Sequence, residues 1–581
     1  MSTPETHANQ GRTIPRSLSR RRFLRLAGLT STGIAFGLAA ACAPTPPAAP
    51  TSAPAAPAKP AESKPAEAAK PAAAPATAAP AAKAASNEKP PTLLHFSGSD
   101  PTTLDPHFGE SSVMASVLGQ GMEALIGYDK DMNPSPLLAE SWQVMDDKLT
   151  WRFKLRQNVK FHNGEPFTAE AVKFTIERTM NEDLRKQGLN DPFPSRSGIQ
   201  QVEIKDPHTI DLVLKQPNVI LPIFLGFLYI LEPKYYGATS IQETALKPIG
   251  TGPYRITEWV KGDRVTFEAF DGYWRGAPPI QKFFQRPVPE AATRLNMLLS
   301  GEADIVGGLA AVDIPAVEAD SKLRVSKAPG SRRAHIGIPT NIPRYKDRRV
   351  RQALVQAVDY DGMAKAILGS IAPAERRAST LVSSKQWEAP GLKPYAYDAN
   401  AAKAALQAAG YPFDEPVKVY ATNESQNTEI VQAVAGYLRA IGIKAEAQPL
   451  DPAVYTNKMR SDTGIDDLYY SSLGSRYNGP EDVSIVTTGQ IWDQTHWSKE
   501  TENGPKFGEL YKQLAQTIDE KQQHDIVNQM LQLFQEEAVW MPLWILPVAA
   551  GVNKRLSWQD TGAGNRFEMW PLGQDPVKIV S

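Results

Sequence analysis

The sequence predicts a mixed α/β fold that is divided into several lobes. About 490 residues (92–581) follow an Ala- and Pro-rich stretch, and that length is too great for one simple hydrophobic core. Within these residues, segments with an apolar residue at every second position alternate with segments whose apolar residues recur every three or four positions. The first pattern is typical of half-buried strands and the second of amphipathic helices.

Residues 1–42 predict an export signal. Residues 19–25, with three consecutive arginines, resemble a twin-arginine export motif. The apolar run Leu26–Ala41 has about 16 residues and is short for a membrane span, which needs about 20. A basic stretch, a short apolar stretch and small residues are together typical of a removable signal. The alternative is a basic patch in front of a membrane anchor.

Cys42 is the single cysteine of the chain and predicts a lipid attachment point. Residues 38–42 resemble a bacterial lipobox, in which the cysteine is acylated and becomes the new N-terminus. Leu38 lies four residues before the cysteine, whereas the lipobox usually has its leucine three before. One cysteine also excludes an internal disulfide and a cysteine-based metal cluster. The alternative is cleavage after Ala41 without a lipid.

Residues 43–91 predict a disordered tether. They are rich in Ala and Pro with scattered Lys and Glu, so they contain too little apolar surface to form a core. The prolines stiffen and extend such a chain. The N-terminal part of the sequence therefore indicates an exported domain held away from a membrane surface.

Three regions of the exported part predict strands. Residues 149–155 alternate between apolar and polar side chains, as a strand with one solvated face does. Residues 202–214 and 254–267 each predict a hairpin, with turns at 206–208 and 261–263.

Other regions predict helices. Val172, Ile176 and Met180 form an apolar stripe after Thr168. Asp347 is a plausible N-cap for a helix whose apolar residues lie at positions 350, 353, 354, 357 and 358. Residues 505–537 predict a long helical stretch.

The charge of the exported part argues against a nucleic-acid partner. Of the 63 basic and 63 acidic residues, 11 and 4 lie in residues 1–92, which leaves a net charge of about −7 on the remainder. This remainder also contains no apolar run of 18 residues or more, so no membrane span is expected there.

The sequence contains no motif that points to catalysis, a metal or a cofactor. The eight histidines are scattered without metal-ligand spacing, and neither a G-x-S-x-G elbow nor a phosphate loop of the G-x-x-x-x-G-K type occurs. Gly250 and Gly252 are followed by Pro253, which removes a backbone donor that a phosphate cradle needs. We therefore expect neither an enzyme nor a bound cofactor.

Several stretches together resemble one family. The longest is LAESWQVMDDKLTWRFKLRQNVKFHNGEPFTAEAVKFTIER at residues 138–178. It is similar to the signature of extracellular solute receptors that serve ABC importers of peptides, nickel and some sugars, called solute-binding protein family 5. Four further stretches occur in the family's order, at 103–107, 250–274, 347–363 and 397–412. The resemblance covers about residues 92–581.

This resemblance implies a two-lobed periplasmic-binding-protein fold of class II. Two α/β lobes close around a solute by a hinge motion, and the permease subunits in the membrane recognise the receptor, which we expect to be a monomer. The implied boundaries are 92–136, 230–332 and 543–581 for lobe I, 137–229 for a small inserted domain and 333–542 for lobe II. The hinge is expected near Arg333–Ile338 and Leu543–Val548.

Residues 476–480, Arg-Tyr-Asn-Gly-Pro, match the place where peptide receptors of the family hold the solute's ammonium with an aspartate. Arg476 stands at the aspartate position and would repel an ammonium. It suits a carboxylate or a phosphate instead, because a guanidinium binds these groups bidentately. The alternative is that Arg476 is a solvated surface charge. Glu481 and Asp482 lie close enough in sequence to neutralise Arg476 or to replace the missing aspartate.

A second departure from the family pattern is Pro339, where the family often has an asparagine; Asn341 follows two residues later. Tryptophans in stretches predicted as loops (Trp387, Trp492 and Trp497) are candidates for stacking on a solute. His335 and His496 are candidates for contact with a metal chelate. The candidate ligand-binding residues are Arg476, Tyr477, Asn478, Tyr469, Tyr470, Trp492, Trp387, Tyr254 and His335.

The sequence thus predicts a lipid-anchored receptor of an ABC importer that takes peptides or a peptide-like solute. Within the same fold, the alternative solutes are oligosaccharides and anionic conjugates such as opines. The alternatives from other classes are an exported enzyme and a structural surface protein.

Overall fold

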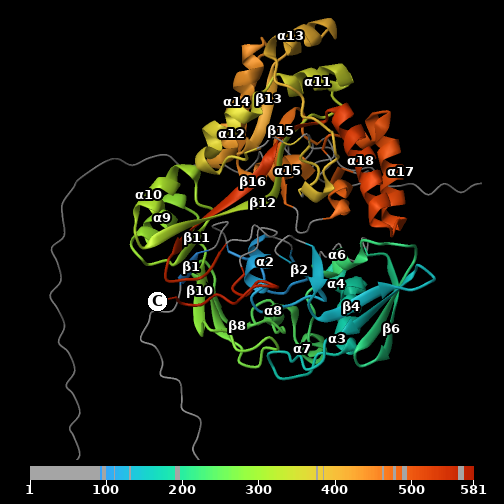
Figure 1. Ribbon diagram of the computed structural model, residues 1–581, viewed down its shortest axis with the longest axis vertical. Coiled ribbons are helices and arrows are strands. Elements are labelled where there is room, and N and C mark those ends of the chain that lie inside the picture. Colours follow the sequence, from blue (N-terminus) through green and yellow to red (C-terminus); the bar gives the residue numbers. More distant parts are fainter. Residues whose placement is uncertain are drawn as a thin grey trace, which may run out of the picture. The chain divides into compact units, whose positions relative to one another are not determined.

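A ten-stranded sheet runs through the folded part of the chain (Figure 1). Its strand order is β14-β13-β15-β12-β16-β11-β1-β10-β9-β8. The strands, in that order, are Ala445–Leu450, Val417–Thr422, Leu468–Gly474, Leu323–Gly337, Trp540–Asn553, Ile305–Gly307, Thr92–Leu94, Lys282–Arg286, Arg264–Ala269 and Tyr254–Val260. We call β14, β13 and β15 the second half of the sheet, and β11, β1, β10, β9 and β8 the first half.

The computed structural model describes the chain from Thr92 to Val580, with gaps. The gaps are residues 95–99, 110–111, 130–132, 190–196, 375–376, 378, 384, 461–463, 475–478, 487–493 and 560–567. The predicted signal, Cys42 and the predicted tether therefore lie outside the described residues. Within the described ranges, no helix is both long and apolar enough to cross a bilayer.

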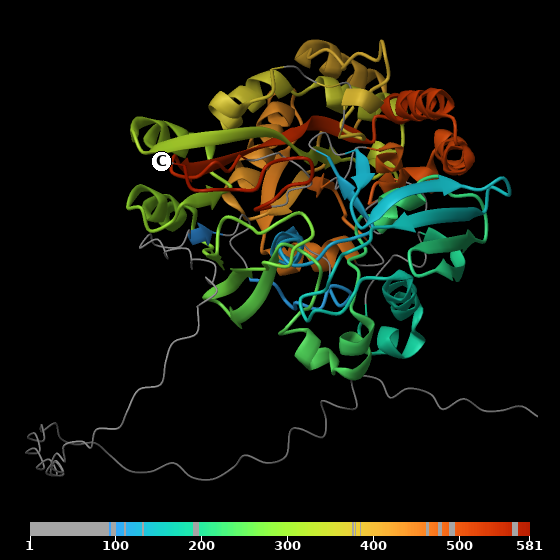
Figure 2. The same cartoon turned by 60° about the horizontal axis from the view of Figure 1, so that its bottom comes forward.

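The two halves of the sheet share its longest strands, β12 with 15 residues and β16 with 14. These strands run side by side in Figures 1 and 2. One end of the pair, Leu323–Ala328 against Val548–Asn553, adjoins β11 of the first half. The other end adjoins β15 of the second half. The same two strands are therefore the covalent route from one half to the other.

The pairing of β12 and β16 is interrupted at one level. Ala328 lies opposite Val548 and Arg332 opposite Leu546, so residues 329–331 face the single residue Pro547. Pro329 and Pro547 have no backbone N–H to donate across the pair. The interruption falls inside the predicted hinge segment Leu543–Val548, and just before the other predicted segment, Arg333–Ile338.

The side chains of β12 alternate between two cores in the second half of the sheet. Ala334, Ile336 and Ile338 pack with helices on one face. These helices are α11 (Arg348–Gln356), α12 (Tyr360–Leu368), α13 (Ala399–Ala408) and α14 (Ser425–Ala440). The opposite face is covered by α15 (Pro452–Arg460), α16 (Trp497–Glu500), α17 (Asn503–Gln516), α18 (Glu520–Glu537) and the 3-10 turns η4 (Lys385–Trp387) and η5 (Pro480–Val486).

The helices of this part follow the predicted apolar stripes closely. Asp347 caps α11 by accepting a hydrogen bond from the backbone N–H of Arg349, as predicted. The predicted helical stretch 505–537 is two helices, α17 and α18, separated at 517–519. Short 3-10 turns η2 (Pro343–Tyr345) and η3 (Gly369–Ile371) connect the helices to the strands.

A separate four-stranded antiparallel sheet has the order β4-β5-β7-β6. Its strands are Ala139–Val144, Thr150–Leu155, Thr209–Leu214 and Ile199–Asp206, and its helices are α3 (Ala169–Met180), α4 (Glu182–Lys186) and α6 (Leu221–Leu225). The predicted strand at 149–155, the hairpin at 202–214 and the helix after Thr168 are confirmed. Its buried apolar side chains form a core of their own.

The first half of the sheet is completed by short elements. The hairpin β8–β9 has its turn at 261–263, as predicted. The remaining elements are α2 (Ser112–Leu118), the small sheet β2 (Ile126–Tyr128) with β3 (Pro134–Pro136), α7 (Pro233–Ala238), α8 (Ile241–Thr244), α9 (Ala291–Leu299), η1 (Ala311–Asp313) and α10 (Ile314–Ala319).

Candidate ligand-binding site

The order of the strands marks one end of the second half as a ligand site. From β13 the chain crosses through α14 to β14 on one side, and then through α15 to β15 on the other side. All three strands are parallel, so the direction of winding reverses between β13 and β15. Ligands of open α/β sheets bind outside the carboxyl ends of the strands at such a reversal. Those ends are Thr422 and Gly474.

A cation and an anion occupy this end of the sheet. Arg332 of β12 lies opposite Gly474, and its Nη2 donates to the carbonyl oxygen of Ser472 at 2.8 Å and to its Oγ at 2.6 Å. Glu424 follows β13 by two residues, and its Oε2 accepts a hydrogen bond of 2.7 Å from Nδ2 of Asn427. Sequence reasoning missed both residues, although Val417, Val419 and Ala421 alternate with other side chains shortly before Glu424, which was a usable strand signal.

Both charges act on Tyr470 of β15. Burial raises the pKa of the Tyr470 phenol to about 12; the Arg332 guanidinium opposes this rise in pKa and the Glu424 carboxylate adds to it. Both charges therefore influence the same buried phenol.

Four predicted site residues, Arg476, Tyr477, Asn478 and Trp492, lie outside the described residues. In the sequence, the first three follow β15 after one intervening residue. Their role stays a prediction.

Tyr469 and Tyr470 are buried side chains of the sheet. Tyr469 is fully buried and lies over Gly337, where a Cβ atom would come within 2.2 Å of its ring. Tyr470 packs into the core under α14, and its carbonyl oxygen accepts the hydroxyl of Tyr455. Both lie four or five residues before Gly474, roughly 13–17 Å along the strand. Both rings take part in the packing of the sheet, and their contact with a solute stays a prediction.

His335 is also a core residue. It is fully buried, and its ring stacks on Trp540 with centroids 3.5 Å apart. Burial lowers the pKa of His335 to about 3, so the imidazole is neutral. Among the described residues, no cluster of three His, Cys, Asp or Glu side chains is placed to hold a metal ion. The described residues thus give no support to a metal role for His335 or His496.

Three aromatic residues predicted to contact the solute have rings that pack in cores, and their contact with a solute stays a prediction. Trp387 stacks on His524 with centroids 4.0 Å apart. Trp497 is fully buried, and its Nε1 donates to the carbonyl of Val486. Tyr254 is fully buried in the first half and meets Phe283 edge-on. The tryptophans lie in η4 and α16, not in loops, because large aromatic rings gain most from full burial.

Asp482 does not replace the missing aspartate. It is 4% exposed, and its Oδ2 accepts hydrogen bonds of 2.8 Å from both the backbone N–H and the Oγ of Ser383. Its Oδ1 lies 3.6 Å from Nη1 of the buried Arg333. The carboxylate is therefore committed to neutralising Arg333 inside the fold.

Pro339 and Asn341 lie at the opposite end of the sheet from the candidate site. Because β12 is antiparallel to β15, residues beyond Gly337 follow the end where β15 begins. This departure from the family pattern therefore lies away from the carboxyl end of β15.

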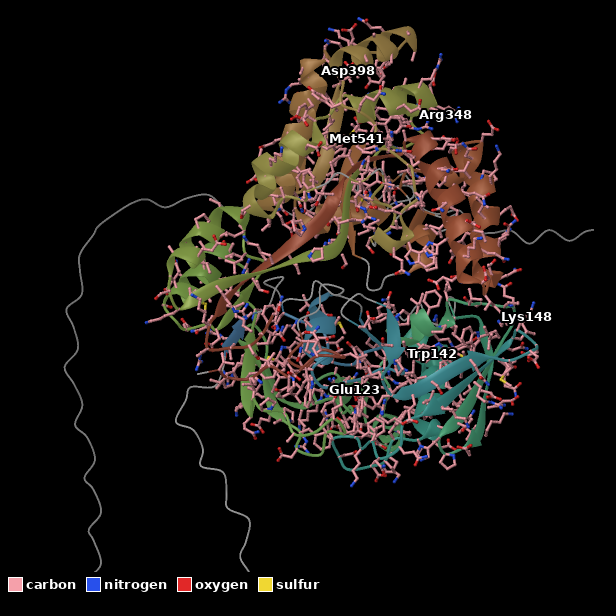
Figure 3. The ribbon with its side chains drawn as sticks, in the orientation of Figure 1. Glu123, Trp142, Lys148, Arg348, Asp398 and Met541 are labelled. Atoms are coloured by element: carbon pink, nitrogen blue, oxygen red, sulfur yellow. The ribbon has the colours of Figure 1, made fainter. Side chains whose placement is uncertain are left out.

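A second polar site lies in the first half, where a cavity of about 80 Å³ has Glu123, Tyr273, Arg275 and Trp570 among the residues of its wall. Glu123 on its wall accepts hydrogen bonds from Thr251 Oγ1 (2.8 Å), Tyr273 Oη (2.9 Å) and Trp274 Nε1 (3.1 Å). Burial raises the pKa of Glu123 against these hydrogen bonds. Figure 3 labels Glu123 among the side chains of this half. Arg275, also on the wall, lies over the ring of Trp570.

Comparisons with known proteins agree with this architecture. Residues 133–490 match the model for "Bacterial extracellular solute-binding proteins, family 5 Middle". The glutathione-binding protein GsiB of Salmonella paratyphi A is 28% identical over 474 residues, which cover 79% of this chain and 90% of that protein.

Two solved structures show the same fold. One is the periplasmic binding protein DppA from Helicobacter pylori in complex with the peptide STSA (TM-score 0.71, 22% identity, 84% of this chain and 98% of that one). The other is AgaA from A. tumefacien R10 in complex with agropinic acid (TM-score 0.67, 22% identity, 84% and 99%). The predicted class II periplasmic-binding-protein fold is confirmed by the first of these likenesses.

Proposed function

Because the chain belongs to family 5 of the bacterial extracellular solute-binding proteins, we propose that it is the receptor of an ABC importer for peptides or a peptide-like solute such as glutathione. The match to the family over residues 133–490 carries this proposal. The likeness to a glutathione-binding protein over 79% of the chain supports the choice of solute. Proteins of this family bind and deliver solutes and are not enzymes.

The proposed site is the carboxyl end of β13 and β15, together with the segment 475–478 that follows β15. We propose the lobe boundaries implied by the resemblance, with β12 and β16 as the connections that bend. Closure about these strands would bury the solute and link binding to a change of shape that the permease subunits recognise.

Anionic conjugates are the second candidate. Arg332 at the site and Arg476 in the adjoining segment favour a solute with a carboxylate. The likeness to the AgaA structure that holds agropinic acid is consistent with such a solute. Oligosaccharides stay an alternative: Trp387 and Trp497 pack in cores, and the third candidate for stacking on a sugar, Trp492, lies outside the described residues.

We further propose that Cys42 is acylated, that residues 43–91 form the tether and that the twin-arginine motif directs export. A receptor on such a tether stays beside its permease and still collides freely with solute.

The proposal is tested by thermal melting of the full chain with a panel of di- to pentapeptides, reduced glutathione, oligosaccharides, nickel chelates and agropinic acid. A solute that binds only the folded state stabilises it by about 2.7 kcal/mol at a hundred times its dissociation constant. We expect peptides or glutathione to raise the melting temperature. A rise with oligosaccharides alone would contradict the proposal, and a rise with agropinic acid alone would support the second candidate.

A further inference from the structure

A backbone hydrogen bond joins the four-stranded part of the chain, β4 to α6, to the second half of the large sheet. The N–H of Val219, in the loop before α6, donates to the carbonyl oxygen of Ala515 in the last turn of α17, at 3.0 Å. α17 covers one face of the second half, whereas α6 packs in the core of the four-stranded sheet. The bond therefore connects these parts at a place other than β12 and β16, the strands that we propose to bend.

The end of α17 is completed by this contact. The last four carbonyl groups of a helix have no donor within the helix. In α17 the carbonyl oxygen of Gln513 accepts the hydroxyl of Thr517 at 2.7 Å, and that of Leu514 accepts the backbone N–H of Thr517 at 3.2 Å. The carbonyl of Ala515, a half-buried residue, accepts instead from Val219, outside the helix. Contact with the four-stranded part thus satisfies a carbonyl that α17 itself leaves open.

The loop before α6 holds the N–H of Val219 in a fixed position. The carbonyl of Asn218 accepts from the N–H of Leu221, and Ile220 has φ −90° and ψ 6°, so this stretch is a type I turn. Nδ2 of Asn218 donates to the carbonyl of Ser197 at 3.2 Å, and its Oδ1 accepts from the N–H of Ile220 at 3.2 Å. Leu221 is fully buried in the core of the four-stranded sheet. The loop therefore moves with that sheet.

The four-stranded part is in turn fixed to the first half. Nη2 of Arg178 in α3 donates to Oδ2 of Asp105 at 2.7 Å, and both side chains are buried. The hydroxyl of Thr244 in α8 donates to the same oxygen at 2.7 Å. Nε2 of His162 lies 3.0 Å from the carbonyl oxygen of Gly252, just before β8. These buried contacts make the first half and the four-stranded part move as one body.

The contact of Val219 with Ala515 lies across the proposed bend. In Figures 1 and 2, α17 lies on the side of the second half that is away from α10, the helix that packs on β12. Bending of β12 and β16 moves α17 relative to α6, because the two helices belong to bodies on either side of the bend. A hydrogen bond of 3.0 Å is lost when its partners separate by a few ångströms.

We infer that residues 215–220 and the end of α17 form a clasp that holds the receptor closed over its solute. The inference rests on the proposed function and assigns a role to the four-stranded part: it carries the clasp from the first half to the second. A shape is favoured only by contacts that differ between the two shapes. The clasp is such a contact within the protein, so the release of solute requires that it break.

The test removes the donor and keeps the turn. Val219 is at the second position of the type I turn, which proline favours, and proline has no N–H. In stopped-flow fluorescence of the full chain, Val219→Pro should release reduced glutathione about fivefold faster than the wild type, as expected for loss of one neutral hydrogen bond. Val219→Ala, the matched control, keeps the N–H and should release it at the wild-type rate. Trialanine or agropinic acid replaces glutathione if the wild type binds only one of these.

A second variant weakens the clasp from the side of α17. Ala515→Lys puts a long side chain beside the contact, and a cation in the last turn of a helix suits the helix dipole, so the fold is kept. This variant should also release the same solute faster. Its control is Gly508→Lys in the middle of α17, where a Cβ atom meets nothing within 4 Å, and this control should release the solute at the wild-type rate.

The melting temperature separates a clasp from a permanent contact. Neither Val219→Pro nor Ala515→Lys should lower the melting temperature of the solute-free chain, whereas both should reduce the rise that the solute produces. An unchanged release rate in both variants would overturn the inference and leave the proposed function intact, and so would an equal loss of melting temperature with and without solute. If Val219→Pro does not fold, Ala515→Lys decides alone. Failure of the wild type to bind any solute of the panel would overturn the proposed function together with the inference.

Discussion

At the residue scale, the helices packed on the second half of the sheet bury an arginine, Arg351, and surround it with hydrogen-bond partners and a carboxylate. Arg351 is 1% exposed; its Nε donates to the carbonyl of Glu537, and its Nη1 donates to the carbonyl of Tyr345. The carboxylate of Glu537 accepts from Arg351 Nη2 and from Asn503 Nδ2. The cluster joins the start of α11 to the end of α18 and the start of α17.

Removing one member of this cluster leaves a buried charge without its partner. We expect Arg351→Ala to lower the free energy of unfolding by about 3–5 kcal/mol, measured by urea denaturation. The double variant Arg351→Met with Glu537→Leu should recover a large part of that loss, since replacing a buried ion pair by apolar side chains is often neutral. If the double variant is as unstable as Arg351→Ala, the loss of stability comes from the hydrogen bonds of Arg351 to backbone carbonyls and not from the unpaired charge of Glu537.

Buried imidazoles predict how stability depends on pH. The pKa of His335 is about 3 in the folded chain and 6.5 ordinarily, so the folded state disfavours the protonated ring. The stability that the folded state gains by burying His335 as a neutral ring is fully present above pH 6.5. It is lost as the pH falls from 6.5 toward 3, because the unfolded chain then binds a proton that the folded chain does not. At pH 5 that loss is about 2 kcal/mol.

The measurement compares the wild type with His335→Phe, which keeps a ring against Trp540. The stability of the wild type relative to this variant should fall by about 2 kcal/mol between pH 7.5 and pH 5. The comparison at pH 7.5 is the control, since the ring is neutral there in both states. A difference that is the same at both pH values would show that His335 is hydrated in the folded chain.

The residue scale is also where a single sequence gives the least information about the site. Tyr254, Trp387 and Trp497 were candidates for solute contact because aromatic rings stack on ligands, yet each is 5% exposed or less. Nothing in a single sequence separates a ring that packs in a core from a ring that meets a ligand. Arg332 and Glu424 were missed for the complementary reason: they reach the same end of the sheet only through the pairing of strands that are far apart in sequence.

At the element scale, local periodicity predicted most of the helices and strands correctly. The strand at 150–155, the turns at 206–208 and 261–263 and the cap at Asp347 all depend on side chains within a few residues of one another. The break between α17 and α18 was not predicted: residues 517–519 carry neither glycine nor proline, and the N-cap signal of Asp519, which accepts from the backbone N–H of Gln522, was missed. Local signals therefore sufficed where local contacts decide the conformation.

The interruption in β12 depends on Gly330. Its φ is +64°, and a Cβ atom there would lie 2.1 Å from the carbonyl oxygen of Leu546. We expect Gly330→Ala to lower the free energy of unfolding by about 2–3 kcal/mol, through backbone strain and displacement of β16. Thermal or urea unfolding measures the change.

The matched control is Gly508→Ala inside α17, where a Cβ atom meets nothing within 4 Å. Removing a glycine from a helix should raise stability by about 0.5–1 kcal/mol. If Gly330→Ala also raised the free energy of unfolding, the interruption in β12 would tolerate a side chain. Gly330 would then not be required for the way β12 and β16 pair there.

At the scale of the whole molecule, the order of the sheet joins segments that no local pattern connects. β12 and β16 pair along their length although more than 200 residues separate them in the sequence. The second half of the sheet is built entirely from those intervening residues. This topology came from the resemblance to the family; periodicity alone predicted only mixed α/β structure in several lobes.

The last prediction concerns how the molecule is held at the membrane, which depends on residues before the folded part. If Cys42 is acylated, a Cys42→Ala variant should lose incorporation of a fatty-acid label and move from the membrane fraction to the soluble exported fraction. Each buried CH₂ of an acyl chain contributes about 0.8 kcal/mol to membrane binding, so loss of the lipid removes nearly all of the attachment. Thr45→Ala, three residues away, should change neither property. A Cys42→Ala protein that stays in the membrane fraction would instead show that the apolar run 26–41 is retained as an anchor.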